Sequence, residues 1–185
     1  MKNTKPDYNW VIKITITSFI ISILLGLLTN TVVNDLSISF SVFVLVLVIL
    51  LGIVFDIIGL AVATATEVPF HAKSAKKVFG ARESIDLIRN AEKVSSFCND
   101  VIGDIAGVLS GGLAASVAVN IFNQFPVINS IIYNLVLTAI VSSITVGGKA
   151  YGKNFAISRS YKIVESCGKI IYKFEKYFHL RKRDK

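Results

Sequence analysis

The sequence predicts an all-α membrane protein with about four transmembrane helices and cytoplasmic amphipathic surface helices. Apolar residues make up 53% of its 185 residues and charged residues only 17%, against about 25% charged in typical soluble domains. The apolar residues are also gathered into long runs, and residues 40–55 contain no charge at all. A helix that crosses a bilayer needs about 20 predominantly apolar residues. These features favour a multi-pass protein of the cell membrane.

Four segments are apolar enough over this length to be predicted as membrane spans. They are residues 10–33, 37–67, 98–122 and 127–149.

The basic residues predict how these spans are oriented. Three of the 20 lysines and arginines lie in the N-terminal segment, six lie between Lys73 and Lys93, and eleven lie from Lys149 onward. The loops 34–39 and 123–129 contain none. Four spans place these two loops on one side of the membrane and every basic segment on the other. Because cytoplasmic loops carry the excess of lysine and arginine, both termini are predicted to be cytoplasmic.

The N-terminal segment 1–36 admits two interpretations. A basic start followed by an apolar stretch is typical of a secretory signal peptide, but here the apolar stretch is long and no A-x-A-like cleavage site follows it. We therefore expect a retained transmembrane helix, with Trp10 as an interfacial anchor.

A patterned cytoplasmic segment, 70–96, follows the second span. Pro69 is expected to end the helix before it, and Gly80 is expected to separate a short lysine-bearing helix from a longer amphipathic one at the membrane surface. In the longer helix three apolar residues recur at helical spacing, namely Ala81, Ile85 and Ile88.

The C-terminal segment 154–185 is predicted to form a basic amphipathic helix and tail. One stripe of the helix can hold Ile157, Tyr161, Val164, Cys167, Ile171, Phe174 and Phe178. Lysines occupy the other positions: Lys162, Lys169, Lys173 and Lys176. Such a helix favours an anionic lipid surface. Membrane topology accounts for the basic residues, so nucleic acid is not an expected partner.

The third span has small residues at every fourth position, Gly103, Gly107, Gly111 and Ala115. Small residues at this spacing let helix backbones approach closely in a membrane. The ridge predicts close packing within the chain or, as functional alternatives, a homodimer interface or a seam that lines an ion path.

Four carboxylates lie within or at the ends of the spans: Asp56, Glu67, Asp100 and Asp104. Ionisable residues in spans are costly and point to function. Neutral oxygen donors occur near the same end of the spans, namely Thr64, Thr66, Ser96 and Asn99. Oxygen-only surroundings suit Mg²⁺ or Ca²⁺ rather than zinc or copper. A simpler alternative places Glu67 and Asp100 at the headgroup boundary, where carboxylates cost little.

The order of these features resembles the membrane domain of the CorB/CorC-type and cyclin M magnesium transporters. The resemblance rests on TEVPF at the end of the second span (Thr66–Phe70), GARESIDLI in the surface helix (Gly80–Ile88), DVIGD in the third span (Asp100–Asp104), and GKAYGK after the fourth (Gly148–Lys153). It covers roughly residues 40–175, and the CorB-like domain is assigned to residues 37–153.

The resemblance implies a dimeric membrane domain with a Mg²⁺ site open to the cytoplasm. Together with the carboxylates and oxygen donors described above, this predicts Glu67, Asp100 and Asp104 as the cation-facing residues, with Thr64 and Thr66 as neutral donors; Asp56 is a weaker candidate.

Three residues depart from the family pattern. Asp104 replaces an asparagine, Lys149 replaces a metal-binding glutamate, and Gly152 replaces a proline. The family's cytoplasmic nucleotide-sensing domains also have no counterpart in these 185 residues. We expect that Asp104 and Lys149 form an internal ion pair.

Handling of divalent cations, by Mg²⁺ transport or sensing, is therefore the leading functional hypothesis. The alternative is a non-transporting scaffold or regulatory subunit that kept the fold, for which Lys149 is the supporting feature. The expected partners are the lipid bilayer, a second copy of the chain and, under the alternative, another membrane protein. No catalytic set or phosphate-binding loop is present, so an enzyme is not predicted.

Overall fold

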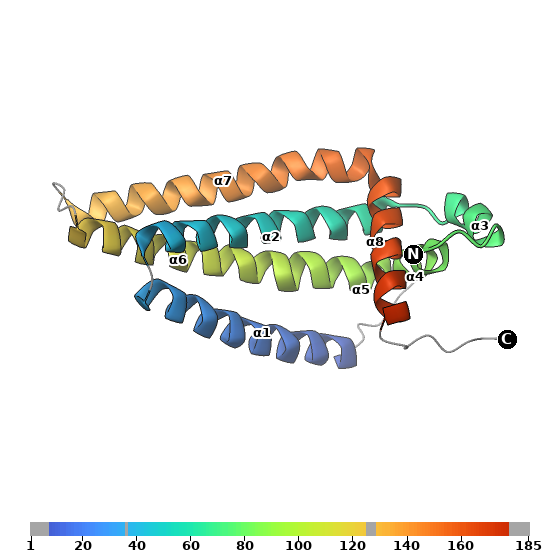
Figure 1. Cartoon of the computed structure of the whole chain (residues 1–185), viewed down its shortest axis with the longest axis horizontal. Helices are drawn as coiled ribbons and strands as arrows, with labels where there is room; N and C mark the ends of the chain where they lie inside the picture. The colour runs from blue at the N-terminus through green and yellow to red at the C-terminus, as the bar shows by residue number, and fades with distance from the viewer. Residues whose placement is uncertain (1–7, 36, 125–128, 178–185) are drawn as a thin grey trace. The chain divides into compact units, whose positions relative to one another are not determined.

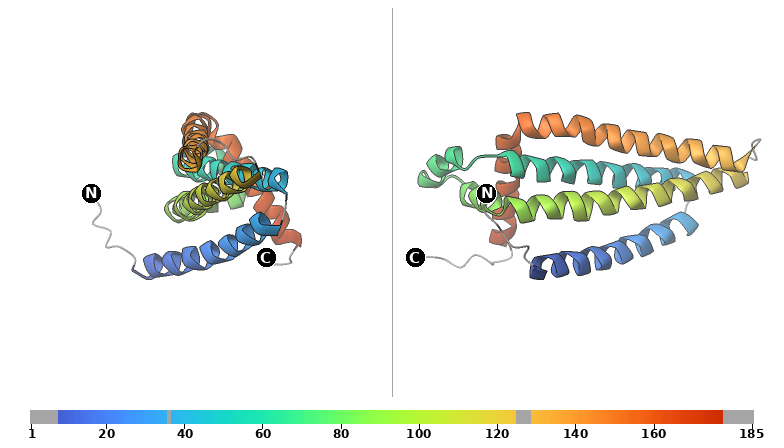
Figure 2. Two further views of the ribbon diagram at one scale, coloured as in Figure 1. Left: turned by 90° about the vertical axis from the view of Figure 1, so that its left-hand side faces the viewer. Right: turned by 180° about the vertical axis from the view of Figure 1, so that it is seen from behind.

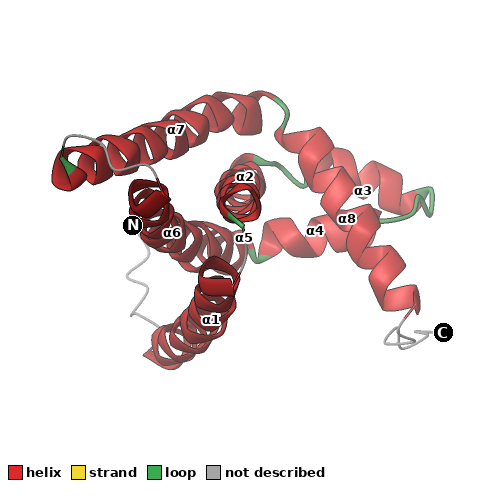
Figure 3. Ribbon diagram, turned by 60° about the vertical axis from the view of Figure 1, so that its left-hand side comes forward, coloured by secondary structure: helices red, strands yellow, loops and turns green. Residues whose placement is uncertain are grey.

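The computed structural model describes residues 8–35, 37–124 and 129–177, and within these ranges the chain is helical with no strand (Figure 3). The elements in chain order are α1 (Tyr8–Asp35), α2 (Ile38–Thr64), α3 (Val68–Ala75), α4 (Ala81–Arg89), α5 (Ala91–Ser96), the π-helical segment η1 (Phe97–Gly103), α6 (Asp104–Gln124), α7 (Ser130–Ser158) and α8 (Ser160–Tyr177). Four helical stretches are long and apolar enough to cross a membrane: Tyr8–Leu27, Ile38–Thr64, Ala91–Asn123 and Ile131–Ser158. The predicted fold class is confirmed.

The ends of the spans differ from the prediction in three places. Helix α2 ends at Thr64, and Pro69 lies in the first turn of α3 instead of stopping a helix. A proline fits there because the first helical N–H groups need no acceptor within the helix. The third apolar stretch begins earlier, at Ala91, and the fourth continues through the GKAYGK segment to Ser158.

The described residues form two compact units, which cross the predicted domain boundaries. The first unit comprises residues 1–53 and 100–148. In it α1, α6 and the adjoining parts of α2 and α7 run roughly lengthwise beside one another (Figures 1 and 2). Helix α1 contacts α6. The core of this unit joins the other three helices through Leu45, Ile49, Leu113, Ala114 and Val141.

Buried hydroxyl groups in the first unit are satisfied within their own helices. Ser110 Oγ donates to the Gly107 carbonyl at 2.9 Å, and Thr145 Oγ1 donates to the Val141 carbonyl at 2.8 Å. Outside the core, large apolar side chains such as Phe19 and Phe43 are at least 60% exposed. Internally satisfied polar groups and apolar outer surfaces are the arrangement that a lipid environment requires.

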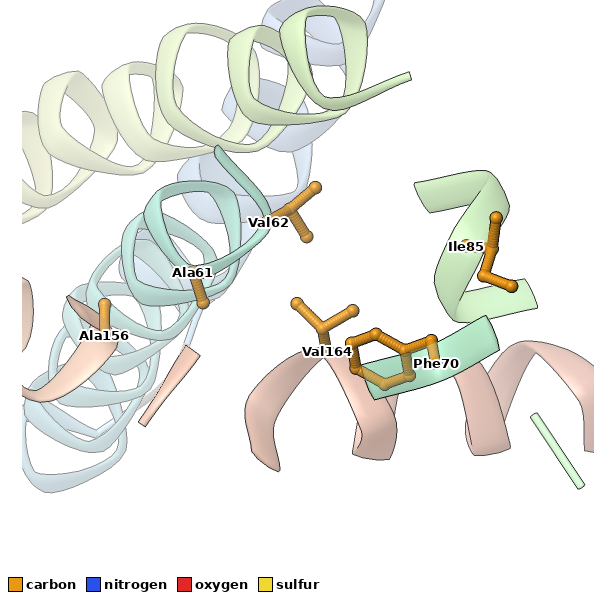
Figure 4. Packing of buried hydrophobic residues seen from close by; sticks show 6 residues of the cluster. All are labelled: Ala61, Val62, Phe70, Ile85, Ala156 and Val164. Atoms are coloured by element: carbon orange, nitrogen blue, oxygen red, sulfur yellow. The ribbon is translucent and has the colours of Figure 1, made fainter. Parts of the chain in front are cut away.

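The second unit comprises residues 54–99 and 149–185. Within it, α8 lies across the last turns of α2 and α7 (Figure 1). Its core gathers six side chains from five helices: Ala61, Val62, Phe70, Ile85, Ala156 and Val164 (Figure 4). The Phe70 ring lies 4.8 Å from the Tyr161 ring, measured between centroids. This packing fixes α3 and α4 against α8.

Two glycines bring α4 and α8 into close contact. Gly80 separates α3 from α4, as predicted, and has a positive φ of 81° that favours glycine. A Cβ at Gly80 would lie 2.6 Å from the Lys169 backbone nitrogen, and a Cβ at Gly168 would collide with Ser84 Oγ and the Gly80 carbonyl oxygen. Ser84 Oγ donates to the Val164 carbonyl at 3.2 Å across this contact.

Protein covers the apolar face of α4 but only part of the apolar surface of α8. Ala81 and Ile85 of α4 are 2% and 6% exposed, and Ile85 packs in the core of the second unit instead of facing lipid. In α8 the predicted apolar stripe is divided: Val164 is buried, whereas Phe174 is exposed. Phe178 and the tail 178–185 lie outside the described residues.

Candidate functional site

The third span contains an irregular helical turn where its polar residues occur. Residues 97–103, FCNDVIG, form the π-helical segment η1 between α5 and α6. A π-helical turn inserts one extra residue per turn and is found frequently at functional sites. It changes which residues of the third span face α2, so Asn99, Asp100 and Asp104 do not follow the simple α-helical spacing that the sequence suggests.

Asn99 carries a buried oxygen without a hydrogen-bond partner. The Oδ1 atom is shielded from solvent, and it has no partner in the part of the chain that the structure describes. A buried polar group left unpaired costs about 1–3 kcal/mol, so such an atom in a folded protein points to an ion or a water molecule bound there.

A glycine on α2 makes room for the Asn99 side chain. A Cβ at Gly59 would collide with Asn99 Oδ1 and would lie 2.9 Å from its Cγ and 3.0 Å from Cys98 Cβ. Asp56, which is half-buried, lies almost one turn before Gly59 on the same face of α2. Asp56 therefore brings a carboxylate to the α2 face against which Asn99 packs.

The predicted metal-facing residues divide between the two units. Asp100 and Asp104 belong to the first unit, and both are exposed. Thr64, Thr66 and Glu67 belong to the second unit, where they lie at the α2–α3 connection. Among the described residues no group of three or more histidine, cysteine, aspartate or glutamate side chains is arranged to hold a metal ion.

Thr64, Thr66 and Lys149 belong to the second unit: Thr64 ends α2, Thr66 lies between α2 and α3, and Lys149 lies within α7. Thr64 Oγ1 donates to the Leu60 carbonyl at 2.9 Å, so its oxygen keeps a free lone pair. Thr66 is exposed in the connection itself, and Lys149 is half-buried on α7. The ion pair expected between Lys149 and Asp104 stays a prediction.

Two basic side chains, His71 and Arg89, bind the carboxylate of Glu67. Its Oε2 atom lies 3.0 Å from His71 Nε2 and accepts a hydrogen bond from Arg89 Nε at 3.2 Å. Partial desolvation acts to raise the pKa of Glu67, but the hydrogen bonds and charges of His71 and Arg89 outweigh it, and the pKa lies below its ordinary value. Glu67 thus links the start of α3 to the end of α4.

A second ionic cluster was not found by sequence reasoning. Glu165 on α8 accepts from Lys73 Nζ and from Lys169 Nζ, each at 2.8 Å. Lys73 Nζ also lies 4.9 Å from the centroid of the Tyr161 ring. The Glu165–Lys169 spacing of four residues was a sequence signal for one half of this cluster, but the contact with Lys73 depends on tertiary packing.

The ion pairs shift the pKa values of Glu165 and Lys73 in opposite directions. Hydrogen bonds from Lys169 and then Lys73 lower the pKa of Glu165 below its ordinary value. The pKa of Lys73 is raised, mainly by its hydrogen bond to Glu165. Both groups therefore stay charged around neutral pH.

A surface groove of about 650 Å³ lies beside α8 in the second unit. Lys77, Arg82 and Lys176 line it together with Glu83 and Glu175. Its mixed charge gives no convergent set of oxygen ligands.

Comparison with known proteins gives no match: no protein-family model, no curated protein and no solved structure is significantly similar to the chain. The resemblance to magnesium transporters accordingly stays a prediction from the sequence motifs.

Proposed function

We propose that this chain is a multi-pass membrane protein that binds a divalent cation, Mg²⁺, through oxygen atoms at the π-helical turn of its third span, and that it transports or senses this ion. In this proposal both termini are cytoplasmic, as the positions of the lysines and arginines favour.

The observation that carries the proposal is the buried, unpaired Oδ1 atom of Asn99 on η1. An amide oxygen is a suitable ligand for a hard cation, which pairs with oxygen and not with soft sulfur donors. Mg²⁺ keeps several of its water molecules and needs only one or two protein carboxylates. A full cage of acidic side chains is therefore not required.

Carboxylates of the second and third spans would supply the negative charge. Asp56 lies on the α2 face that carries Gly59, and Asp100 and Asp104 follow Asn99 along the third span. A negative-inside membrane potential would favour entry of Mg²⁺ by about 4.6 kcal/mol per 100 mV, twice the value of about 2.3 kcal/mol for a single charge.

Mg²⁺ uptake into proteoliposomes tests transport. The vesicles would contain a Mg²⁺-sensitive dye and carry an inside-negative potassium diffusion potential. We expect uptake with the unaltered chain and a reduction of at least about tenfold in Asn99→Ala and Asp104→Ala. Asn134→Ala, which removes a half-buried asparagine from α7, is the matched control and should transport normally. Uptake equal in all four proteins would overturn the proposed site.

A second candidate function is a scaffold or regulatory subunit that has lost the ion path. The engagement of Glu67 by Arg89 and His71 favours it, because this carboxylate is already neutralised by protein groups. Lys149 favours it as well, because it places a cation within the fourth candidate span, Ile131–Ser158.

The variant Lys149→Glu separates the two functions. If the ammonium group of Lys149 fills a former cation-binding site, the unaltered chain should not bind Mg²⁺, and Lys149→Glu should restore Mg²⁺ binding. If the unaltered chain binds Mg²⁺ without moving it, the function is sensing. Equal Mg²⁺ affinity of the two proteins would show that Lys149 does not block the site.

A further inference from the structure

Helix α8 has an outward face whose composition differs from that of its inner face. Val164 and Gly168 are buried on the inner side. Three large apolar residues point outward, namely Ile170, Phe174 and Tyr177, which are 65%, 60% and 84% exposed. Four exposed lysines accompany them: Lys162, Lys169, Lys173 and Lys176.

The rotation of α8 about its axis is fixed by contacts within the second unit. The Gly80–Gly168 contact and the bond from Ser84 Oγ to the Val164 carbonyl hold one side of the helix against α4. The ion pair from Lys73 to Glu165 holds α3 at the same helix. The outward face is therefore a defined surface of the folded unit.

Lysine and apolar residues form two parallel rows on this face. The pairs Lys169–Ile170, Lys173–Phe174 and Lys176–Tyr177 repeat at intervals of three to four residues, which places one row of lysines directly beside one row of apolar side chains. The long methylene stems of lysines can lie along an apolar boundary while the ammonium groups stay in water. This is the pattern of a helix that lies in the plane of a membrane interface.

The position of α8 in the chain identifies its surroundings. The fourth candidate span ends at Ser158 and α8 begins at Ser160, so only Arg159 separates the two. Within the second unit α8 lies across the last turns of α7 (Figure 1). A helix that begins one residue after a membrane span, and turns across it, starts at the bilayer surface.

The positive charge of the outward face favours anionic over zwitterionic lipids. Of the two acidic residues of α8, Glu165 is paired with lysines and Glu175 is half-buried, so the exposed charges of the face are the lysines. We propose that the outward face of α8 is a docking surface for the phosphate headgroups of anionic phospholipids, with Ile170, Phe174 and Tyr177 inserted between them. This surface is independent of the proposed cation site.

Quenching of a tryptophan on α8 by brominated lipids tests this proposal. The chain has a single tryptophan, Trp10, so the full-length double variant Trp10→Phe, Phe174→Trp reports on α8 alone. The protein would be placed in lipid nanodiscs that contain brominated phosphatidylglycerol or brominated phosphatidylcholine at equal fractions. We expect a preference for phosphatidylglycerol of at least about fivefold, the contribution of one lysine near an anionic surface, and its decline at high salt.

Lysine variants provide the control. In the same background, Lys162→Gln, Lys173→Gln and Lys176→Gln together should abolish the preference while quenching by both lipids remains, and the corresponding arginine variants should retain it. Lys169 is left unchanged because it pairs with Glu165. No quenching by either lipid, as a partner protein covering α8 would produce, or equal quenching by both lipids in the lysine-containing protein, would overturn the proposal. Both contradicting outcomes are measured on the protein that keeps its lysines, so the test does not depend on whether the glutamine variant folds.

Discussion

At the scale of single residues, glycines decide where helices meet in the second unit. Position 168 requires a glycine, because Ser84 Oγ and the Gly80 carbonyl oxygen occupy the space that a Cβ would need. Gly80 in turn adopts a positive φ and approaches the backbone of Lys169. The contact of α4 with α8 therefore includes backbone atoms on both sides, which cannot rotate away as a side chain can.

We expect Gly168→Ala to destabilise the protein by about 1–3 kcal/mol, the usual cost of overpacking. The gain in helix propensity, up to about 1 kcal/mol for Ala over Gly, is too small to compensate. Thermal melting of the detergent-purified protein measures the change. Gly147→Ala is the matched control, since no atom lies within 4 Å of a Cβ at that position. A melting temperature of Gly168→Ala equal to that of the control would contradict the close contact.

Sequence reasoning succeeded at some residues and failed at others for identifiable reasons. The break at Gly80 was predictable, because glycine is the residue that tolerates the left-handed conformation. The environment of Asn99 was not, since the π-helical turn and the approach of Gly59 depend on tertiary packing. The contact of Glu67 with Arg89 was not predictable either, because Arg89 lies 22 residues further along the chain.

At the scale of elements, α8 organises the second unit. It packs against α4 through Gly168 and binds α3 through Glu165. The amphipathic pattern of α8 was evident in the sequence, but the sequence did not show which part of its apolar surface faces protein. The fourth span also extends further than predicted, because the glycines and lysines after Val146 continue the helix to Ser158.

The ionic cluster on α8 predicts a pH-dependent stability. The pKa of Glu165 is lowered in the folded state, so its contribution is fully present above the ordinary value of 4.5 and is lost as the pH falls through the lowered pKa. The pKa of Lys73 is raised, so the contribution of Lys73 is present below 10.5 and is lost as the pH rises through the raised pKa.

We therefore expect Glu165→Gln to lower stability by about 1 kcal/mol at neutral pH, since partly exposed ion pairs contribute about 0.2–1 kcal/mol each. Melting curves from pH 3 to pH 9 measure the difference from the unaltered protein, which should shrink toward the acid end. Glu175→Gln on the same helix is the control. A difference that stays constant down to pH 3 would show that packing, and not the ion pairs, accounts for it.

At the scale of the whole molecule, the small-residue ridge of the third span is only partly used within the chain. A Cβ at Gly52 on α2 would lie 3.0 Å from Ala106 Cβ and 3.8 Å from the Gly103 carbonyl oxygen, so the start of the ridge packs against α2. Within the described part of the chain, no atom lies within 4 Å of a Cβ at Gly107 or Gly111, and Val108 between them is 77% exposed. This open part of the ridge is available to a second copy of the chain.

We expect the chain to form a dimer through this surface. Light scattering of the detergent-solubilised protein should give the mass of two chains, and Gly107→Leu with Gly111→Leu should reduce it to one, because leucines prevent close approach of the backbones. Gly147→Leu introduces the same bulk at an open position of α7 and should leave the dimer intact. A dimer that persists in the double leucine variant would place the interface elsewhere.

Thermal melting of the purified protein across a Mg²⁺ titration at constant ionic strength tests whether the chain binds this cation at Asn99. A ligand present at 100 times its dissociation constant adds about 2.7 kcal/mol to the stability of the folded state. We expect a saturable rise in melting temperature that is lost in Asn99→Ala. Without Mg²⁺, Asn99→Ala should be no less stable than the unaltered protein, because the substitution removes a buried unpaired oxygen. Glu67→Gln, which alters a carboxylate held by Arg89 and His71, should keep the rise. No Mg²⁺-dependent rise in the unaltered protein, or an equal rise in Asn99→Ala, would contradict the proposed cation site.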